Sequence, residues 1–321
     1  MDDHLLGTRL PPSSDAAPGV HVSLRDLVAL KFRAKGFTFL PRQPVQSLLA
    51  GRHASRLRGR GLNFEEIRHY RPGDDVRQID WKATLRLRKT QSRVYTEERE
   101  RSVLLVVDQR ITMFFGSEKN MKSVTAAEAA ALAAWRVISQ NDRLGGIVFN
   151  DTELSAIPAR RSQSSVMRIL NEVVRMNGEL SHKKEIHPNA GMLNQALHGC
   201  ERIAKHDCLV CIITDGHGND DQTREILTRI ARHNDLLFIF IHDPLEARLP
   251  DAGPLVFGDG AYQLEVDTSS RSLRDRFSDK FADERAKGRR FLIQRETPVI
   301  PLSTAEDVPK QLRQLLGTRR R

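Results

Sequence analysis

The sequence predicts an α/β protein with a mostly parallel central sheet and helices on both of its faces. From about residue 100, short apolar runs alternate with longer segments of helical periodicity, as expected of right-handed strand–helix–strand crossovers. Several of the short runs are apolar without alternation, which is typical of strands buried on both faces. Aspartates follow three of these runs, at the strand ends where such sheets carry their sites.

The individual elements follow from local pattern. Val103–Val107 is a continuous apolar run that ends at Asp108, which predicts the first buried strand. The alanine-rich segment Val124–Ile138, which includes Trp135, predicts a helix covered on nearly all sides. The elements that follow are strands at 144–149, 209–213 and 236–241 and helices at 162–176, 191–204 and 223–232.

The flanking segments are shorter and less regular. Ser23 begins a short amphipathic helix whose apolar residues recur at helical spacing, namely Leu24, Leu27, Val28 and Phe32. An extended segment is expected at 86–96, before the first strand of the sheet. Toward the carboxyl terminus we expect a strand at 262–266, a helix around 273–281, an extended segment at 291–301 and a last helix capped by residues 303–307.

These elements divide the chain into four parts. Residues 1–20 are rich in proline, serine and alanine and predict a flexible leader. Residues 21–99 are predicted to form a basic N-terminal subdomain with β character. Residues 100–245 form the α/β domain, and residues 246–321 an extension that packs on it.

Composition excludes some classes of protein. The acidic start lacks the apolar core of a secretory signal, and no run approaches the roughly 18 apolar residues of a membrane span. The three cysteines cannot form a disulfide framework without a leftover, which fits a reducing cytoplasm. Cys208 and Cys211 lie three apart on a strand and therefore point to opposite faces, so packing thiols are favoured over a zinc site. We expect a cytoplasmic protein.

Positive charge is concentrated in one segment. The net charge of the chain is +10, and residues 52–93 contain twelve Lys and Arg against five Asp and Glu. A segment with this excess suits binding to nucleic acid, another polyanion or an acidic protein face. An arginine-rich surface neutralised in part by its own aspartates explains the same composition. Few aromatic residues lie between the basic ones, which disfavours a stacking platform for single strands.

The densest motif of the chain runs from Arg68 to Arg86. Pro72-Gly73 predicts a type II turn, because proline fixes φ at one central position and glycine supplies a positive φ at the next. Around this turn, Arg and Asp side chains are expected to form a cross-linked ion-pair network, with Trp81 anchoring it on apolar packing. The motif residues are Arg68, Tyr70, Arg71, Pro72, Gly73, Asp74, Asp75, Arg77, Asp80, Trp81, Lys82 and Arg86.

Motifs for catalysis are missing from the sequence. It contains no Gly-x-Ser-x-Gly elbow, no His-Glu-x-x-His pair and no phosphate-binding loop. Asp74, Asp75 and Asp80 lie among basic residues that favour their charged forms, which suits ion pairs better than proton transfer. We therefore expect no catalytic residues. A metal-dependent phosphate-ester hydrolase that uses the strand-end aspartates stays an alternative, and it would need a divalent ion.

The segment Asp108-Gln109-Arg110-Ile111-Thr112 resembles the Asp-x-Ser-x-Ser loop of von Willebrand factor A domains, which holds Mg²⁺ together with a second carboxylate, here Asp215. Arg110 stands where a hydroxyl would lie, and Met192 stands at the position of a further threonine. A guanidinium has only donors and cannot ligate a cation. We expect a degenerate metal site and no cofactor; if an ion binds, its ligands would be Asp108, Thr112 and Asp215.

The segment from Tyr70 to Arg86, with Gly59-x-Gly61 before it and Tyr95-x-x-Glu98 after it, closely resembles the signature of the domain of unknown function 58 family. The resemblance covers roughly residues 45–245. It implies a von Willebrand A-like domain in a bacterial protein, often encoded beside a MoxR-type AAA+ ATPase, with a chaperone-like role in assembly or maturation. Many relatives carry N-terminal membrane helices, and this chain is expected to be a soluble member. We expect a non-enzymatic adaptor; nucleic-acid binding through residues 52–93 is the main alternative.

Overall fold

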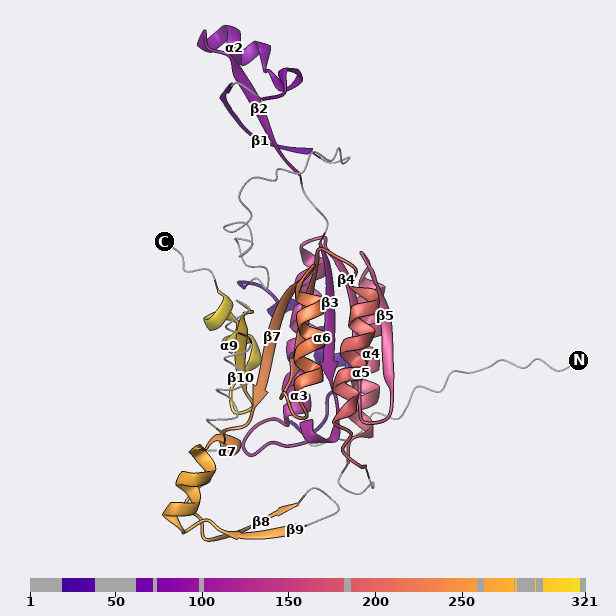
Figure 1. The fold of residues 1–321 in the computed structure, drawn as a ribbon, viewed down its shortest axis with the longest axis vertical. Coiled ribbons are helices and arrows are strands. Elements are labelled where there is room, and N and C mark those ends of the chain that lie inside the picture. Colours follow the sequence, from indigo (N-terminus) through magenta and orange to yellow (C-terminus); the bar gives the residue numbers. More distant parts are fainter. Residues whose placement is uncertain are drawn as a thin grey trace, which may run out of the picture. The chain divides into compact units, whose positions relative to one another are not determined.

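The computed structural model describes residues 19–37, 62–71, 74–97, 101–181, 186–258, 263–279, 281, 292 and 297–317. The chain divides into two compact units, one formed by residues 1–41 and 101–321 and the other by residues 42–100. We call them the α/β unit and the signature unit. Their ribbons are drawn in Figure 1. The predicted leader at 1–20 and the first ten residues of the basic segment, 52–61, lie almost wholly outside the described residues.

A six-stranded sheet forms the centre of the α/β unit, in the order β10-β7-β6-β3-β4-β5. All neighbouring strands are parallel except β5, which pairs antiparallel with β4 at one edge. This confirms the predicted mostly parallel sheet. The strands are β3 (Ser102–Asp108), β4 (Arg143–Phe149), β5 (Leu154–Arg160), β6 (Cys208–Thr214), β7 (Asp235–His242) and β10 (Val299–Ser303).

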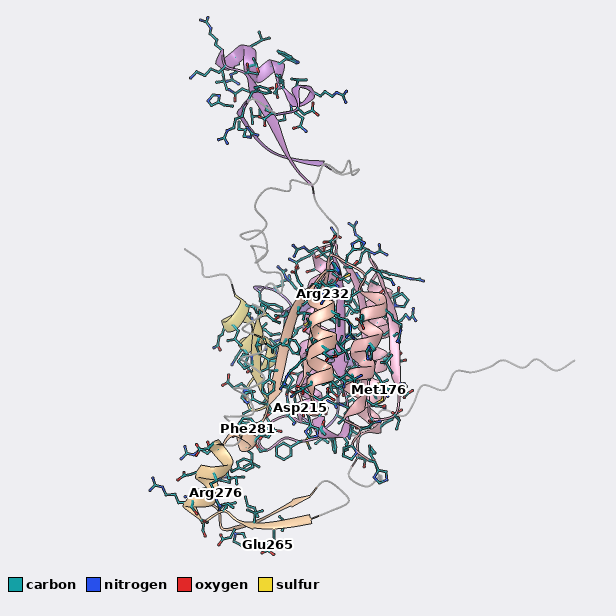
Figure 2. All side chains as sticks on the ribbon, in the orientation of Figure 1. Met176, Asp215, Arg232, Glu265, Arg276 and Phe281 are labelled. Carbon is teal, nitrogen blue, oxygen red and sulfur yellow. The ribbon has the colours of Figure 1, made fainter. Side chains whose placement is uncertain are left out.

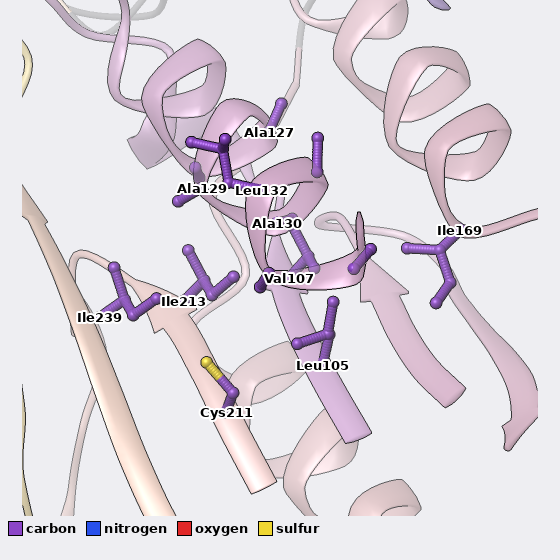
Figure 3. Close-up of a cluster of buried hydrophobic side chains, with 14 of the residues drawn as sticks. Leu105, Val107, Ala127, Ala129, Ala130, Leu132, Ile169, Cys211, Ile213 and Ile239 are labelled. Atoms are coloured by element: carbon purple, nitrogen blue, oxygen red, sulfur yellow. The ribbon is translucent and has the colours of Figure 1, made fainter. Parts of the chain in front are cut away.

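Helices cover both faces of the sheet, which is why its central strands are apolar throughout. Alternate residues of β3 point to opposite faces: Leu105 packs toward α3, whereas Val106 packs in the second core with α5 and α6. Figure 3 shows Leu105 and its neighbours beneath the alanines of α3. The covering helices are α3 (Lys122–Ser139), α4 (Gln163–Glu179), α5 (Gly191–Ile203), α6 (Asp221–Ala231) and α9 (Val308–Leu316).

The first helix of the chain belongs to the α/β unit. α1 (Leu24–Ala29) and η1 (Leu30–Arg33) place Leu27 and Leu30 in the core beside α3, and Trp135 donates its indole N–H to Leu27 O at 3.1 Å. The predicted N-terminal boundary at residue 21 was therefore wrong, because the apolar face of this helix is buried by α3 rather than by the signature motif. Phe32, expected on that face, is 80% exposed.

The C-terminal residues complete the same unit. β10 extends the sheet beyond β7, and α9 packs on α3. A separate antiparallel hairpin is formed by β8 (Pro254–Gly258) and β9 (Gln263–Asp267), and residues 271–279 are helical. The short elements η4 (Ile111–Met113) and α7 (Pro244–Ala247) follow the ends of β3 and β7. Among the described residues, no helix combines the length and apolar character needed to cross a bilayer.

The signature unit is a hairpin with a helical connection. β1 (Leu62–His69) pairs antiparallel with β2 (Gln91–Glu97), and η3 (Val76–Gln78) and α2 (Trp81–Leu87) lie between them in the sequence. The extended segment predicted at 86–96 therefore begins later than expected, since α2 continues to residue 87. Asp80 begins α2 by accepting a hydrogen bond from Ala83 N at 3.0 Å.

Candidate functional site at the carboxyl end of the sheet

Acidic side chains gather at the carboxyl ends of four neighbouring parallel strands. Asp108 ends β3, Asp215 follows β6 and Asp243 follows β7, as predicted, and Asp151 lies two residues beyond β4. In Figure 2, Asp215 lies at this edge of the sheet and Arg232 lies toward the other end. Parallel strand direction is what brings these carboxylates, distant in sequence, to one edge.

Asp108 is bound by the arginine that follows it two residues later. The Arg110 guanidinium donates through Nη2 to Asp108 Oδ2 at 2.7 Å and through Nε to Oδ1 at 3.0 Å, and both side chains are almost completely buried. Thr214 Oγ1 donates to Asp108 Oδ2 at 2.7 Å. Burial alone would lower the pKa of Arg110, but the charge and hydrogen bonds of Asp108, together with the charges of Asp215 and Asp151, outweigh it, so the pKa is raised and the guanidinium stays charged.

Asp215 is bound by a lysine from a different element. Lys122, at the start of α3, donates through Nζ to Asp215 Oδ2 at 2.8 Å and to Glu246 Oε1 at 2.5 Å, and its side chain is only 4% exposed. Burial would raise the pKa of Asp215, yet the Lys122 ammonium reverses the shift and lowers it. Each acid predicted as a metal ligand thus already holds a cation that belongs to the chain.

The other two strand-end aspartates bind backbone and hydroxyl groups. Asp243 is fully buried and accepts from Ser117 Oγ and Thr304 Oγ1, each at 2.5 Å, so it connects the β3–α3 loop to the segment after β10. Asp151 accepts from Ile111 N at 2.6 Å and from Asn189 N at 2.8 Å. Burial raises the pKa of Asp151. Both residues therefore fasten the loops that surround the Asp108–Arg110 pair.

Two polar atoms of the site keep unused hydrogen-bonding capacity. Nη1 of Arg110 and Oγ1 of Thr112 are buried without a hydrogen-bond partner among the described residues. The Arg110 guanidinium instead lies over the Phe149 ring, 5.6 Å from its centroid. Thr112, predicted as a third ligand, therefore makes no hydrogen bond to either predicted acid. Met192 is buried in the core between α5 and the sheet.

Sequence reasoning missed Lys122, Asp151, Thr214 and Glu246 in this site. Asp151 could have been found by the rule that selected the other strand-end acids, because it lies only two residues beyond β4. Glu246 closes a capping box with Asp243, which the spacing Asp-x-x-Glu indicates. Nothing local pointed to Lys122, since its partner lies 93 residues away.

The signature motif forms ion pairs in which the arginines are partly exposed and the aspartates are more shielded. Arg68 holds both carboxylate oxygens of Asp74, at 2.8 and 2.9 Å, and this hydrogen bonding lowers the pKa of Asp74. Arg93 Nε donates to Asp80 Oδ2 at 2.8 Å, and the pKa of Asp80 is lowered first by its helix-capping bond from Ala83 N and then by Arg93. The described residues of the signature unit thus form two separate ion pairs, one of them to Arg93 outside the motif, instead of the cross-linked network that was predicted.

Three motif predictions had other outcomes. Trp81 was expected to anchor the network on apolar packing, but its side chain is 66% exposed at the start of α2, so that prediction was wrong. Pro72 and Gly73, with the predicted type II turn, lie outside the described residues. Asp75 accepts a hydrogen bond from Arg77 N and begins η3. Of the remaining motif residues, Tyr70 is partly buried, and the exposed ones are Arg71, Lys82 and Arg86.

The cysteines lie in the core of the α/β unit. Cys211 packs on the α3 side of the sheet, whereas Cys208 packs on the α5 side, as the alternation along a strand predicted. Burial raises the pKa of Cys200 and of Cys211 to about 12. These two thiols therefore stay protonated and contribute packing.

Comparison with known proteins identifies relatives without a described activity. Residues 66–287 match the family model described as "Protein of unknown function DUF58". Uncharacterized proteins of Mycobacterium bovis and Mycobacterium tuberculosis are each 28% identical over 281 residues, which cover 87% of this chain and 86% of theirs.

Two solved structures show a weaker likeness. The first is a conserved hypothetical protein BatB from Bacteroides thetaiotaomicron, with 14% identity and a TM-score of 0.39 over 67% of this chain and 96% of that one. The second is the SpRpn10 VWA domain, with 9% identity and a TM-score of 0.34 over 67% of this chain and 94% of that one.

Proposed function

Because the chain belongs to the family described as protein of unknown function DUF58, we propose that it is a non-enzymatic adaptor that binds protein partners. The observation that carries the proposal is the pairing of Asp108 with Arg110 and of Asp215 with Lys122. A carboxylate held by a buried cation has no free oxygen pair to accept a proton or to ligate an ion. The surface at the carboxyl ends of the parallel strands, which we call the carboxyl-end edge, then binds a partner without catalysing a reaction.

Built-in cations take the place of a metal ion in this proposal. Mg²⁺ needs near-octahedral oxygen ligands. Here two donors of Arg110 already occupy both oxygens of Asp108, and the Lys122 ammonium contacts Asp215. A divalent ion at this place would lie against two positive charges. The residues present therefore do not suit the ion, and a metal-dependent hydrolase would lack its ligands for the same reason.

Magnesium titration tests this part of the proposal. We expect the melting temperature of the wild-type chain to stay unchanged, because Asp108 and Asp215 are already bound by Arg110 and Lys122. The matched variant is Arg110→Ser, which supplies a hydroxyl and releases Asp108. Its melting temperature should be lower and should rise with Mg²⁺. Saturable stabilisation of the wild-type chain by Mg²⁺ would contradict the proposal.

The proposed partner is a MoxR-type AAA+ ATPase, which the family resemblance implies. Binding of the purified ATPase to the full chain is measured by biolayer interferometry. Glu118 and His217 are exposed in the loops after β3 and β6, so the double variant Glu118→Arg/His217→Glu alters the carboxyl-end edge while leaving the buried pairs intact. We expect this variant to weaken binding by about tenfold or more, as a change at an energetically important contact does.

The control variant for the binding experiment lies near the opposite ends of the strands, where β7 begins. Arg232 is exposed beyond the end of α6, and Arg232→Glu reverses one surface charge, as Glu118→Arg does. We expect it to bind like the wild-type chain. Equal binding by all three proteins, or no binding by any of them, would refute the assignment of this edge to that ATPase.

A further inference from the structure

The helix α2 carries its large apolar side chains on the outside of the signature unit. Trp81 is 66% exposed and Leu85 is 80% exposed. They lie four residues apart, so they are neighbours on one stripe of the helix. The residues between them on the inner side are small: Ala83 and Thr84 are partly buried, and Thr84 Oγ1 accepts a hydrogen bond from Gln91 N of β2 at 2.9 Å.

This orientation is fixed by polar contacts at the start of the helix. Asp80 accepts from Ala83 N and from Arg93 Nε, and Asp80 N donates to Gln91 O at 2.9 Å. A rotation of α2 that buried Trp81 against the hairpin would break these bonds. The exposed apolar stripe is therefore a built feature of the unit and not a consequence of a loosely placed helix.

Unpaired positive charge surrounds the apolar stripe. Lys82 and Arg86 each follow a stripe residue by one position, and so form a second stripe about 100° around the helix. Six exposed basic residues between 71 and 89 make no ion pair with a described residue, namely Arg71, Arg77, Lys82, Arg86, Arg88 and Lys89. Asp74 and Asp80, in contrast, are already paired.

We infer that Trp81 and Leu85 form a docking site for an acidic partner segment that carries bulky apolar side chains. Tryptophan and arginine are the residue types that dominate binding energy at protein interfaces, where an apolar centre is surrounded by charge. The basic side chains favour a partner segment that contains Asp or Glu. The apolar stripe favours a segment that also carries bulky apolar side chains. Nucleic acid fits less well, because stacking uses aromatic faces and Leu85 offers none. The inference rests on the proposed binding function but concerns a different surface.

A random peptide library displayed on phage identifies the sequence that binds. The library is selected on the full wild-type chain and depleted on the double variant Trp81→Ser/Leu85→Ser. We expect the enriched peptides to combine Asp or Glu with Leu, Phe, Trp or Met. A synthetic copy of the most enriched peptide should bind the double variant about tenfold or more weakly, and its affinity for the wild-type chain should fall as salt is raised.

The two tryptophans of the chain give a local readout. In protein labelled with 5-fluorotryptophan, the Trp81 resonance should shift on peptide binding, while that of the buried Trp135 should not. An unchanged Trp135 resonance also shows that the double variant keeps its α/β unit. Val256→Ser, which removes another exposed apolar side chain, is the matched control and should bind the peptide like wild type.

Several outcomes would overturn the inference. In the selection, these are enriched peptides without acidic residues, or no enrichment relative to the double variant. In the labelled protein, one is a Trp81 resonance that is already protected from solvent in the chain alone. The last is a Trp81 shift that polyuridine RNA or phosphatidylglycerol vesicles cause more strongly than any peptide does. Failure of the ATPase binding experiment would leave this peptide result untouched, because its variants lie at the edge of the sheet.

Discussion

The two units of the molecule use the same ion-pair chemistry in different surroundings. In the α/β unit, Arg110 and Asp108 are buried almost completely, whereas in the signature unit Arg68 and Asp74 remain partly open to water. A buried charge that loses its partner cannot be rehydrated, so the loss is large. A charge at the surface is rehydrated at once. The edge of the sheet is therefore fixed by its ion pairs, while the signature unit keeps its charges available for binding.

The largest effect is expected for Arg110→Met. It leaves Asp108 buried and unpaired, and we expect the free energy of unfolding of the α/β unit to fall by about 3–5 kcal/mol. This loss in the free energy of unfolding is measured by urea denaturation, with the emission of the buried Trp135 as the signal. The double variant Asp108→Asn/Arg110→Met removes both charges and should recover at least half of the loss. A loss similar in the single and the double variant would show that packing of Arg110, and not its charge, matters.

A smaller loss is expected for Lys122→Met, about 2–4 kcal/mol at pH 8, because Asp215 keeps the hydrogen bond from His217 N and Glu246 is partly hydrated. Without the ammonium, burial raises the pKa of Asp215. The native state then prefers the protonated acid, so the loss should shrink as pH falls from 8 to 4.5. A loss that is independent of pH would contradict the role assigned to the ion pair.

Glu128 is a half-buried carboxyl that makes no ion pair with a residue the structure describes. Burial raises its pKa from 4.5 to about 7, so the folded chain holds this proton between those pH values and the unfolded chain does not. Stability should therefore fall as pH rises through this window. Glu128→Gln should match wild type near pH 4.5 and be more stable by about 1–3 kcal/mol at pH 8. Parallel stability curves for the two proteins would exclude the raised pKa.

The smallest effect is expected for Asp74→Asn. Its ion pair with Arg68 is partly exposed to water, and asparagine can still accept the hydrogen bond from Arg71 N. The urea midpoint of the signature unit, followed by the Trp81 resonance in protein labelled with 5-fluorotryptophan, should not change beyond the scatter of repeated measurements. A midpoint shift as large as that of Arg110→Met would remove the distinction between the two units.

The sheet could be predicted because its strands are locally distinctive. Val103–Val107 is apolar without interruption, which is the pattern of a strand covered on both faces, and the run has the length of a strand. β5 was missed because it is an edge strand with Pro158 in it, which weakens the strand signal. Trp81 was misplaced because a large aromatic residue suggests burial, while the contacts that turn α2 outward come from β2, which follows α2 in the chain.

In the candidate site, the sequence allowed the positions of the acidic residues to be predicted, but not most of their partners. The predicted strand ends locate the carboxylates from local pattern, and Arg110 lies only two residues after Asp108, so the arginine could be proposed to take the place of an ion. Lys122 could not be found, because its pairing with Asp215 depends on the packing of α3 beside β6. Long-range ion pairs have no local sequence signal.

The hydroxyl bonds of Asp243 have a consequence for biosynthesis of the chain. One carboxylate joins Ser117, near the middle of the α/β unit, to Thr304, which follows the outermost strand β10. Until residue 304 has left the ribosome, this carboxylate lacks the Thr304 hydroxyl, and β7 presents an open edge that can pair with another nascent chain. Translation that stops before β10 should therefore release an aggregation-prone product, even though five of the six strands are already complete.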